Sequence, residues 1–262
     1  MTRMRLSISR IKLFKACRRA YELKYVEGLE PVQKAEALQT GLSYHKLLEE
    51  LYASGSLDDI EEFTKEKAMA TAYQKYIYPK FKVKACEEWQ TFNLITGDTL
   101  VGRVDGIAED GRLVEHKTTS SDITEEYEYN LQWDEQMLAY MMMTGAREIY
   151  YTVCKKPTIR QKKTETDEEF FNRMVEWYDE DTDSKIRVLL ISRTDEEVEE
   201  FMDAVSKMAT EMNTTDHYYR NTAYCKQWGR MCDYAPICLH YDSNQEYVGF
   251  TRKDGEYGDT QI

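Results

Sequence analysis

The chain has 262 residues, of which 42% are hydrophobic and 32% are charged, and its formal net charge is −13. Its longest apolar runs are too short to span a membrane, and residues 1–20 lack the apolar segment of a secretory signal. These features predict one globular domain in the cytoplasm, without a membrane partner. The six cysteines are then expected to be core residues or metal ligands, because structural disulfides are rare in that compartment.

The negative charge is unevenly distributed along the sequence. Residues 1–25 contain eight Lys or Arg and one acid, Glu22, whereas residues 155–163 contain five cations and no acid. A local basic surface matters more for phosphate binding than the net charge does. DNA is therefore compatible with this composition, although such runs are also typical of solvated surfaces.

The first part of the chain predicts three helices. The first has Ser7 or Ser9 as its N-cap and is expected to end at Gly28. A second helix is expected at 41–53, and a third, polar helix at 58–78. The apolar face of the first helix consists of Ile11, Phe14, Tyr21 and Tyr25.

The hydrophobic pattern then changes to the two-residue period of strands. Three successive strands are expected at 89–95, 100–108 and 112–119. The elements expected after them are a helix at 126–144, a strand at 148–155, a helix at 167–178, a strand at 186–192 and a helix at 195–212. This order predicts an α+β fold with a β-meander in the middle.

The turn at 109–111 joins the last two strands of the meander. A three-residue loop that ends in glycine favours a type I turn with a G1 bulge. In that register Asp105 lies opposite Glu115, and the strand period places Lys117 on the same face. A two-residue Asp-Gly loop would instead pair Asp105 with His116 and separate the two acids.

These residue types together indicate a hydrolytic metal site. Two facing carboxylates repel each other unless a cation joins them, and Mg²⁺ or Mn²⁺ prefers oxygen ligands. Lys117 can orient or deprotonate a metal-bound water, or neutralise developing charge. His45 offers a nitrogen ligand, and Glu49 lies one helical turn later, within reach of a second metal. Taken alone, a Glu-x-Lys pair on a strand is most often an exposed ion pair.

Four motifs occur in the order helix, strand, strand, helix: Gly41-Leu-Ser-Tyr-His45, Gly102-Arg-Val-Asp105, Glu115-His-Lys117 and Gln136-Met-Leu-Ala-Tyr140. This order resembles the RecB-like branch of the PD-(D/E)XK nuclease superfamily, which is built on an αβββαβ core. One departure is modest, since Val104 replaces the proline of the literal Pro-Asp dipeptide.

The resemblance also implies roles for the motif residues. The metal would be bound by His45, Asp105, Glu115 and the main-chain carbonyl of His116. The catalytic residues would be Lys117, Glu115 and Asp105, with Lys117 as the catalytic lysine. Gln136 and Tyr140 would line the DNA path.

A C-x6-C-x5-C array contains Cys225, Cys232 and Cys238. Three clustered cysteines suit zinc or an iron–sulfur cluster about equally, and the fourth ligand is either His240 or Cys17. One N-terminal and three C-terminal cysteines resemble the iron–sulfur nucleases, which include the AddB nuclease module, the CRISPR adaptation nuclease and phage exonucleases. That resemblance implies a [4Fe–4S] cluster on Cys17, Cys225, Cys232 and Cys238, with zinc less favoured.

The complete hypothesis is a single domain over residues 1–262. It has a restriction-endonuclease-like core at 41–155, helical additions, and a cysteine-ligated cluster that joins segments 1–27 and 213–240. The cluster would fix the first helix against the tail, where Arg18, Arg19 and Arg230 would contact DNA phosphates.

The expected function is metal-dependent DNA hydrolysis, as an exonuclease at DNA ends in recombination, repair or phage replication. A helicase or a single-strand annealing protein is a candidate partner. The alternative is a non-catalytic DNA-binding or assembly subunit that keeps a nuclease-like core.

Overall fold

The computed structural model describes residues 3–32, 36–227, 229–239 and 247–253. The chain divides into two units, and each is described by itself. The core unit comprises Ala35–Gln90 and Arg103–Glu197. The terminal unit comprises Met1–Lys34, Thr91–Gly102 and Val198–Ile262. Both segments in which we expected the cysteine cluster, 1–27 and 213–240, belong to the terminal unit.

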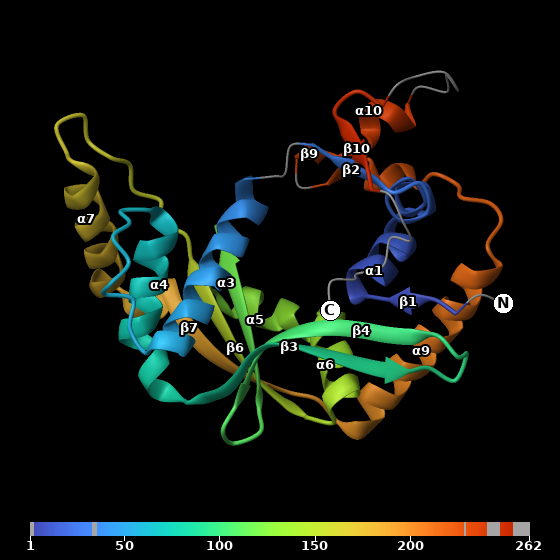
Figure 1. Ribbon diagram of the computed structural model, residues 1–262, viewed down its shortest axis with the longest axis horizontal. Helices are drawn as coiled ribbons and strands as arrows, with labels where there is room; N and C mark the ends of the chain where they lie inside the picture. Colours follow the sequence, from blue (N-terminus) through green and yellow to red (C-terminus); the bar gives the residue numbers. More distant parts are fainter. Residues whose placement is uncertain (1–2, 33–35, 228, 240–246, 254–262) are drawn as a thin grey trace. The chain divides into compact units, whose positions relative to one another are not determined.

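A mixed sheet of six strands has the order β1-β4-β5-β6-β7, with β3 also paired to β4 (Figure 1). Its strands are β1 (Arg5–Leu6), β3 (Val83–Asn93), β4 (Thr99–Ala108), β5 (Leu113–Thr119), β6 (Glu148–Lys155) and β7 (Ile186–Ser192). β5 and β6 are parallel, whereas β4 with β5 and β6 with β7 are antiparallel. The five expected strands are confirmed, and β3 begins six residues earlier than expected. The short strand β1 pairs with the start of β4 and was not expected.

Two helices precede the meander in the core unit. α3 (Glu36–Ser54) contains the helix expected at 41–53, and α4 (Lys65–Tyr76) begins after its N-cap Thr64. The prediction of a polar helix at 58–78 is wrong, because Met69, Ala70 and Tyr73 of α4 are fully buried. They pack with α3 in one apolar cluster. α4 is therefore part of the core.

The helix expected at 126–144 is divided into α5 (Glu125–Asn130) and α6 (Glu135–Thr144). Asp134 has an extended backbone, and its carboxylate accepts a hydrogen bond from the Gln136 main-chain N–H, so a new helix begins there. The later helices are α7 (Asp167–Glu180), α8 (Thr182–Lys185) and α9 (Asp195–Thr214). The order α3-β3-β4-β5-α6-β6 confirms the αβββαβ core.

The terminal unit contains α1 (Ile8–Ala16), α2 (Arg18–Tyr21) and the π-helical turn η1 (Glu22–Val26). Ser7 is confirmed as the N-cap of α1, but the single helix expected up to Gly28 is interrupted at Cys17, which has an extended backbone. Two segments far apart in the sequence come together where β2 (Leu29–Pro31) pairs with β10 (Phe250–Arg252). The remaining elements are β8 (Lys226–Gln227), β9 (Arg230–Met231) and α10 (Ala235–Cys238).

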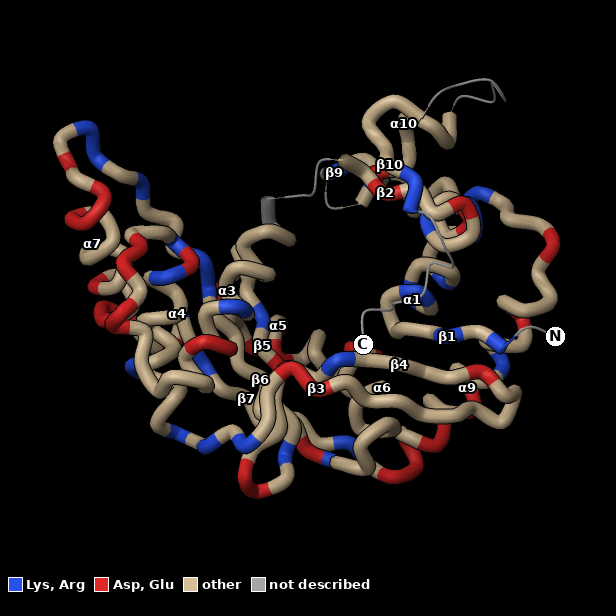
Figure 2. The backbone as a smooth tube through the Cα atoms, in the orientation of Figure 1, with Lys and Arg blue, Asp and Glu red and all other residues tan. Residues whose placement is uncertain are grey.

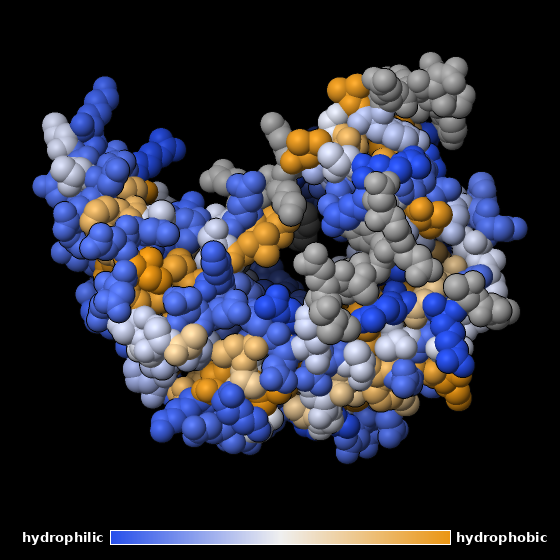
Figure 3. Space-filling view, in the orientation of Figure 1, coloured by the Kyte–Doolittle hydropathy of each residue, from blue (hydrophilic) through white to orange (hydrophobic). Residues whose placement is uncertain are grey.

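No helix among the described residues is long and apolar enough to cross a membrane. In the face shown in Figure 3, apolar residues form separate patches on a largely hydrophilic surface.

Candidate active site

The β4–β5 hairpin has the register that brings the two predicted acids together. Gly106 pairs with Val114, and the Ala108 N–H donates to the Arg112 carbonyl at 2.8 Å. The loop is closed by Gly111, whose φ of 89° lies in the left-handed region that favours glycine. Continuing the pairing by one residue puts Asp105 opposite Glu115. The three-residue loop is thus confirmed over the two-residue alternative.

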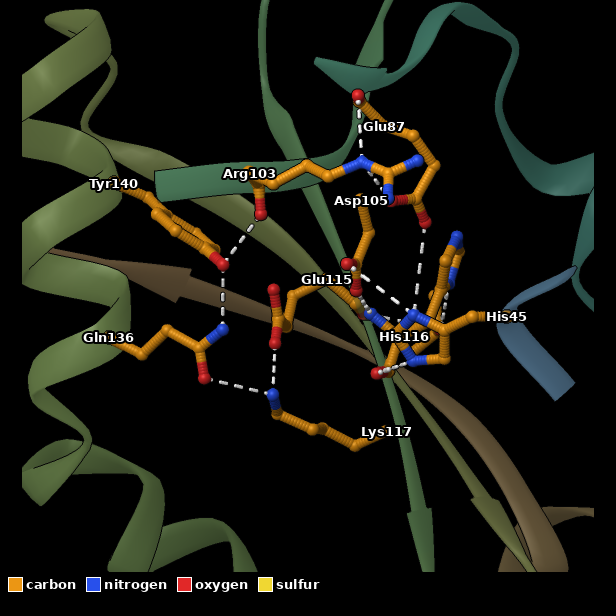
Figure 4. Close-up of polar contacts among 10 residues, drawn as sticks. His45, Glu87, Arg103, Asp105, Glu115, His116, Lys117, Gln136 and Tyr140 are labelled. Atoms are coloured by element: carbon orange, nitrogen blue, oxygen red, sulfur yellow. Dashed lines mark hydrogen bonds and ion pairs between the residues drawn. The ribbon is translucent and has the colours of Figure 1, made fainter. Parts of the chain in front are cut away.

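Asp105 and Glu115 lie on one face of the hairpin, together with Lys117 (Figure 4). The regular backbone hydrogen bonding between β4 and β5 is interrupted here, because the His116 N–H donates to the side-chain oxygen Oδ2 of Asp105 at 2.7 Å. The Glu115 side chain is only 2% exposed and forms an ion pair with Lys117. Apart from that ion pair, neither Glu115 oxygen has a hydrogen-bond partner among the described residues. A buried carboxylate that has a second acid beside it and one ammonium as its partner is stabilised further by an additional cation.

His45 extends from α3 toward the same place. Its Nε2 lies 2.8 Å from the main-chain oxygen of His116, and its Nδ1 lies 3.5 Å from Asp105 Oδ1. The imidazole nitrogen of His45 and the main-chain oxygen of His116 are atom types that Mg²⁺ or Mn²⁺ accepts as ligands, and an ion bound by both would replace the proton that they now share.

Glu87 also lies at this site, although no motif in the sequence contains it. Its carboxylate lies 3.9 Å from His45 Nδ1 and is 15% exposed. His45, Glu87 and Asp105 form a group that could hold a metal ion, with one ligand atom from each within 4.8 Å of the others. The only sequence signal for Glu87 is a pair of acids, Glu87-Glu88, just before the expected strand. Glu49 is exposed and is not in this group.

A chain of hydrogen bonds holds Lys117 from the side of α6. The Lys117 ammonium donates to Gln136 Oε1 at 2.9 Å, and Gln136 Nε2 donates to the Tyr140 hydroxyl at 2.8 Å. The Tyr140 hydroxyl then donates to the Arg103 carbonyl of β4 at 2.7 Å (Figure 4). The one-turn spacing of Gln136 and Tyr140 allows this, since residues four apart share a helix face. Gln136 therefore contacts the predicted catalytic lysine directly, and Tyr140 contacts Gln136.

Burial and the charges of neighbouring groups shift the pKa values of the site's acids, lysine and histidine in different directions. Burial, and then the charge of Asp105, raise the pKa of Glu115 to about 7. For Asp105, burial acts in the same direction, but the hydrogen bond and charge of His45 outweigh it and lower the pKa to about 2. Burial opposes the charged form of Lys117, yet the charges of Glu115 and Asp105 outweigh it and raise the pKa. Burial lowers the pKa of His116 to about 3, so its ring is neutral.

The stability of the protein without divalent ions should therefore fall as the pH rises from about 4.5 to 7. The folded pKa of Glu115 lies above its unfolded value of about 4.3, so the folded state holds the proton more tightly in that window. In EDTA, we expect the melting temperature of wild type to decrease across this pH range by several degrees more than that of Glu115→Gln. We also expect Mn²⁺ to raise it more at pH 8 than at pH 5, since ligands must be deprotonated. If the melting temperatures of wild type and Glu115→Gln changed with pH in the same way, the raised pKa of Glu115 would be contradicted.

The four predicted cluster cysteines lie in the terminal unit. Cys17, Cys232 and Cys238 belong to one apolar cluster, and the Cys232 N–H donates to the Cys225 carbonyl at 2.9 Å. Asn221 contacts two of the thiols, since its N–H donates to Cys17 Sγ at 3.4 Å and its carbonyl accepts from Cys225 Sγ at 3.9 Å. In the described part of the chain, however, the sulfur atoms do not form a group like that of the acidic site. His240, the alternative ligand, lies outside the described residues.

The arginines expected to bind DNA also lie in the terminal unit. Figure 2 shows Lys and Arg along β1 and α1, in the segment whose sequence is basic. Each arginine is in an ion pair: Arg18 with Glu211, Arg19 with Glu22, and Arg230 with Asp233. Their contact with phosphates stays a prediction.

A histidine, two acids and a lysine converge at one face of the β4–β5 hairpin in the interior of a mixed sheet, which is the arrangement of a metal-dependent hydrolase. A profile of the PD-(D/E)XK nuclease superfamily matches residues 5–239, so the chain belongs to that superfamily and is a phosphodiester-hydrolysing nuclease. No curated protein matches the sequence significantly.

Two solved structures illustrate the relationship. A candidate exonuclease from Eubacterium rectale has 15% identity and a TM-score of 0.57, over 92% of this chain and 90% of that chain. An alkaline exonuclease from Laribacter hongkongensis has 14% identity and a TM-score of 0.36, over 80% of this chain and 90% of that chain. At such identity only the fold can be compared, and only for the first structure.

Proposed function

We propose that this protein is a divalent-metal-dependent DNA exonuclease that acts at DNA ends. The observation that carries the proposal is the convergence of His45, Asp105, Glu115 and Lys117 at one face of the β4–β5 hairpin, where the buried Glu115 carboxylate has the Lys117 ammonium as its ion-pair partner. Superfamily membership supports hydrolysis of a phosphodiester bond. The fold of the Eubacterium rectale protein, which is described as a candidate exonuclease, is in keeping with action at ends.

The residues at the site would divide the work of hydrolysis. His45, Asp105, Glu115 and the His116 carbonyl would hold Mg²⁺ or Mn²⁺, which supplies an acidified water and neutralises phosphate charge when bound. Lys117, whose raised pKa keeps it an ammonium, would donate hydrogen bonds to the phosphate as negative charge develops. It becomes easier to deprotonate when a cation neutralises Glu115, and could then accept a proton from the attacking water.

Gln136 and Tyr140 would support Lys117 as well as line the DNA path. Their hydrogen bonds fix the ammonium between Glu115 and α6. Partners of this kind commonly change activity by about 10- to 100-fold when they are lost.

The decisive experiment uses linear DNA labelled at the 5′ or the 3′ end, in single- and double-stranded form, and a closed circular DNA of the same sequence. With Mg²⁺ or Mn²⁺ we expect stepwise release of nucleotides from linear DNA, no attack on the circle, and no product in EDTA. Equal cleavage of circle and linear DNA would identify an endonuclease. Tight DNA binding with no product under any metal would favour the non-catalytic assembly subunit.

For the terminal unit we propose a [4Fe–4S] cluster on Cys17, Cys225, Cys232 and Cys238. Their shared neighbourhood supports it. Four thiolates can hold a single zinc ion or a cluster that binds each thiolate through a different iron, and the iron and zinc content of the purified protein distinguishes the two.

The remaining parts of the hypothesis rest on the length and composition of the sequence and on the family resemblance. They are a cytoplasmic role in recombination, repair or phage replication, a helicase or annealing partner, and the single-domain organisation. They stay predictions.

A further inference from the structure

Thr152 is a polar residue in the buried, apolar part of β6. Its side chain is 1% exposed, and the residues beside it in the strand, Tyr151, Val153 and Cys154, are buried hydrophobic residues. Valine has nearly the shape of threonine and would fill this place without burying a hydroxyl, which is costly unless the hydroxyl is hydrogen-bonded. The role of Thr152 therefore lies in what its hydroxyl contacts.

The Thr152 hydroxyl contacts two groups of β5. Its Oγ1 lies 3.3 Å from the main-chain oxygen of Glu115 and 2.7 Å from Nδ1 of the His116 ring. The carbonyl oxygen can only accept, so the one hydroxyl hydrogen donates to it, and Oγ1 accepts a hydrogen bond from Nδ1–H. The neutral ring then has its lone pair on Nε2, which has no hydrogen-bond partner among the described residues.

These hydrogen bonds continue through the main chain to Asp105. The peptide group that joins Glu115 to His116 has its oxygen directed at Thr152, and its N–H donates to Asp105 Oδ2 at 2.7 Å. Four groups are thus hydrogen-bonded in series: the His116 ring, the Thr152 hydroxyl, this peptide group and the Asp105 carboxylate. Every donor in the series points toward the carboxylate, and hydrogen bonds aligned in this way polarise and strengthen one another.

The His116 ring, at the start of the series, is held by aromatic contacts. It stacks on the ring of Tyr52 in α3, with centroids 5.9 Å apart and planes at 22°. It also lies perpendicular to the ring of Tyr73 in α4, with centroids 5.2 Å apart. His45, which is two helical turns before Tyr52 in α3, contacts the main-chain oxygen of His116 through Nε2. α3 therefore contacts both the ring and the carbonyl of His116.

We propose that Thr152 is a positioning residue for the metal site. Through the peptide group between Glu115 and His116, it fixes the Asp105 carboxylate and the adjacent His116 carbonyl in the orientation that binds a divalent ion. Hydrogen-bond partners of metal ligands commonly tune the affinity for the ion in this way. The inference deepens the proposed nuclease function and rests on it for the role of Asp105 as a metal ligand.

The test measures the Mn²⁺ affinity of the full chain by calorimetry, without DNA. Thr152→Val keeps the shape of the side chain but removes the hydroxyl, and should weaken Mn²⁺ binding by about 10- to 100-fold. Thr152→Ser keeps the hydroxyl and should bind Mn²⁺ nearly as tightly as wild type. Thr71→Val is the matched control, since it removes a hydroxyl that donates to the Lys67 carbonyl within α4, and its Mn²⁺ affinity should equal that of wild type. A loss of less than about tenfold in Thr152→Val, or an equal loss in Thr152→Ser, would overturn the inference.

Nitrogen-15 NMR of the His116 ring, without metal, gives a second measurement that a threonine with only a packing role would not affect. We expect the ring proton on Nδ1 in wild type and in Thr152→Ser. In Thr152→Val, the Nδ1–H has lost its acceptor, so the tautomer with the proton on Nε2 should become more populated. A proton on Nε2 in wild type would refute the series of hydrogen bonds, and this measurement decides if Thr152→Val does not fold.

The two proposals fail in different ways. Weaker Mn²⁺ binding by Thr152→Val, together with no DNA cleavage by wild type, would refute the nuclease proposal and leave this inference intact. DNA cleavage by wild type, together with an unchanged Mn²⁺ affinity in Thr152→Val, would do the reverse. A wild-type protein that binds no Mn²⁺ would overturn both.

Discussion

Asp105→Asn and Lys117→Met should each lower the rate of DNA cleavage by at least about 10³-fold, which corresponds to about 4 kcal/mol of activation free energy. Asp105 contacts His45 and the His116 N–H, so it organises the metal ligands from both sides of the hairpin. Lys117 is the cation beside Glu115 and points to the same centre. The amide of Asn can still accept from the His116 N–H, and Met fills most of the volume of Lys.

Single-turnover cleavage of end-labelled DNA with saturating Mn²⁺ is the measurement. Glu109→Gln removes a carboxylate from the exposed hairpin loop, and Lys84→Ala removes an exposed ammonium from β3, so both should cleave at near wild-type rates. Melting curves check that the site variants remain folded. If both site variants retain activity within about tenfold of wild type, the assignment of this site is wrong.

The sequence was sufficient for the part of the site that depends on local geometry. One turn sets the register of a hairpin, and in strands a shift of one residue moves every side chain to the other face. The three-residue turn that ends at Gly111 therefore brings Asp105 and Glu115 together, whereas a two-residue turn ending at the same glycine would have separated them. The αβββαβ order was predictable for a similar reason, because helices and strands differ in hydrophobic period.

Glu87 could not be found in this way. It belongs to no spacing motif, and its approach to His45 depends on where α3 lies relative to β3 in the folded chain, which is a tertiary relationship. The hydrogen bonds from Lys117 to α6 also depend on tertiary packing. The spacing of Gln136 and Tyr140 predicts that the two side chains share one helix face, but it does not predict which groups they contact. Family resemblance suggested a DNA path for them, whereas the structure adds contacts to Lys117.

Two helix boundaries were missed because single residues left the helical conformation. Asp134 caps a new helix with its own side chain, which a hydrophobic pattern does not reveal. Cys17 is extended between α1 and α2, and its thiol accepts a hydrogen bond from the Asn221 N–H. A long-range contact thus accompanies the break, and this interruption places a cysteine of the N-terminal segment beside the C-terminal segment.

Replacing Cys17 with serine should remove the iron as completely as replacing Cys232, if the terminal unit holds the proposed cluster. Protein purified without air should be brown and contain about four irons per chain. Both variants should be colourless, and both should melt at a lower temperature, because a metal cluster that joins distant segments couples its binding energy to folding. The measurements are iron content, visible absorption and thermal unfolding of anaerobic samples.

Cys86→Ser is the matched control, since Cys86 lies in β3 of the core unit, away from the four cysteines in sequence, and should leave the iron content unchanged. The equivalence of Cys17 and Cys232 discriminates between the two metal hypotheses. A zinc site made from Cys225, Cys232, Cys238 and His240 would lose its ion in Cys232→Ser but not in Cys17→Ser. A colourless wild-type protein with one zinc per chain, unaffected by Cys17→Ser, would therefore refute the cluster and leave the site at the β4–β5 hairpin untouched.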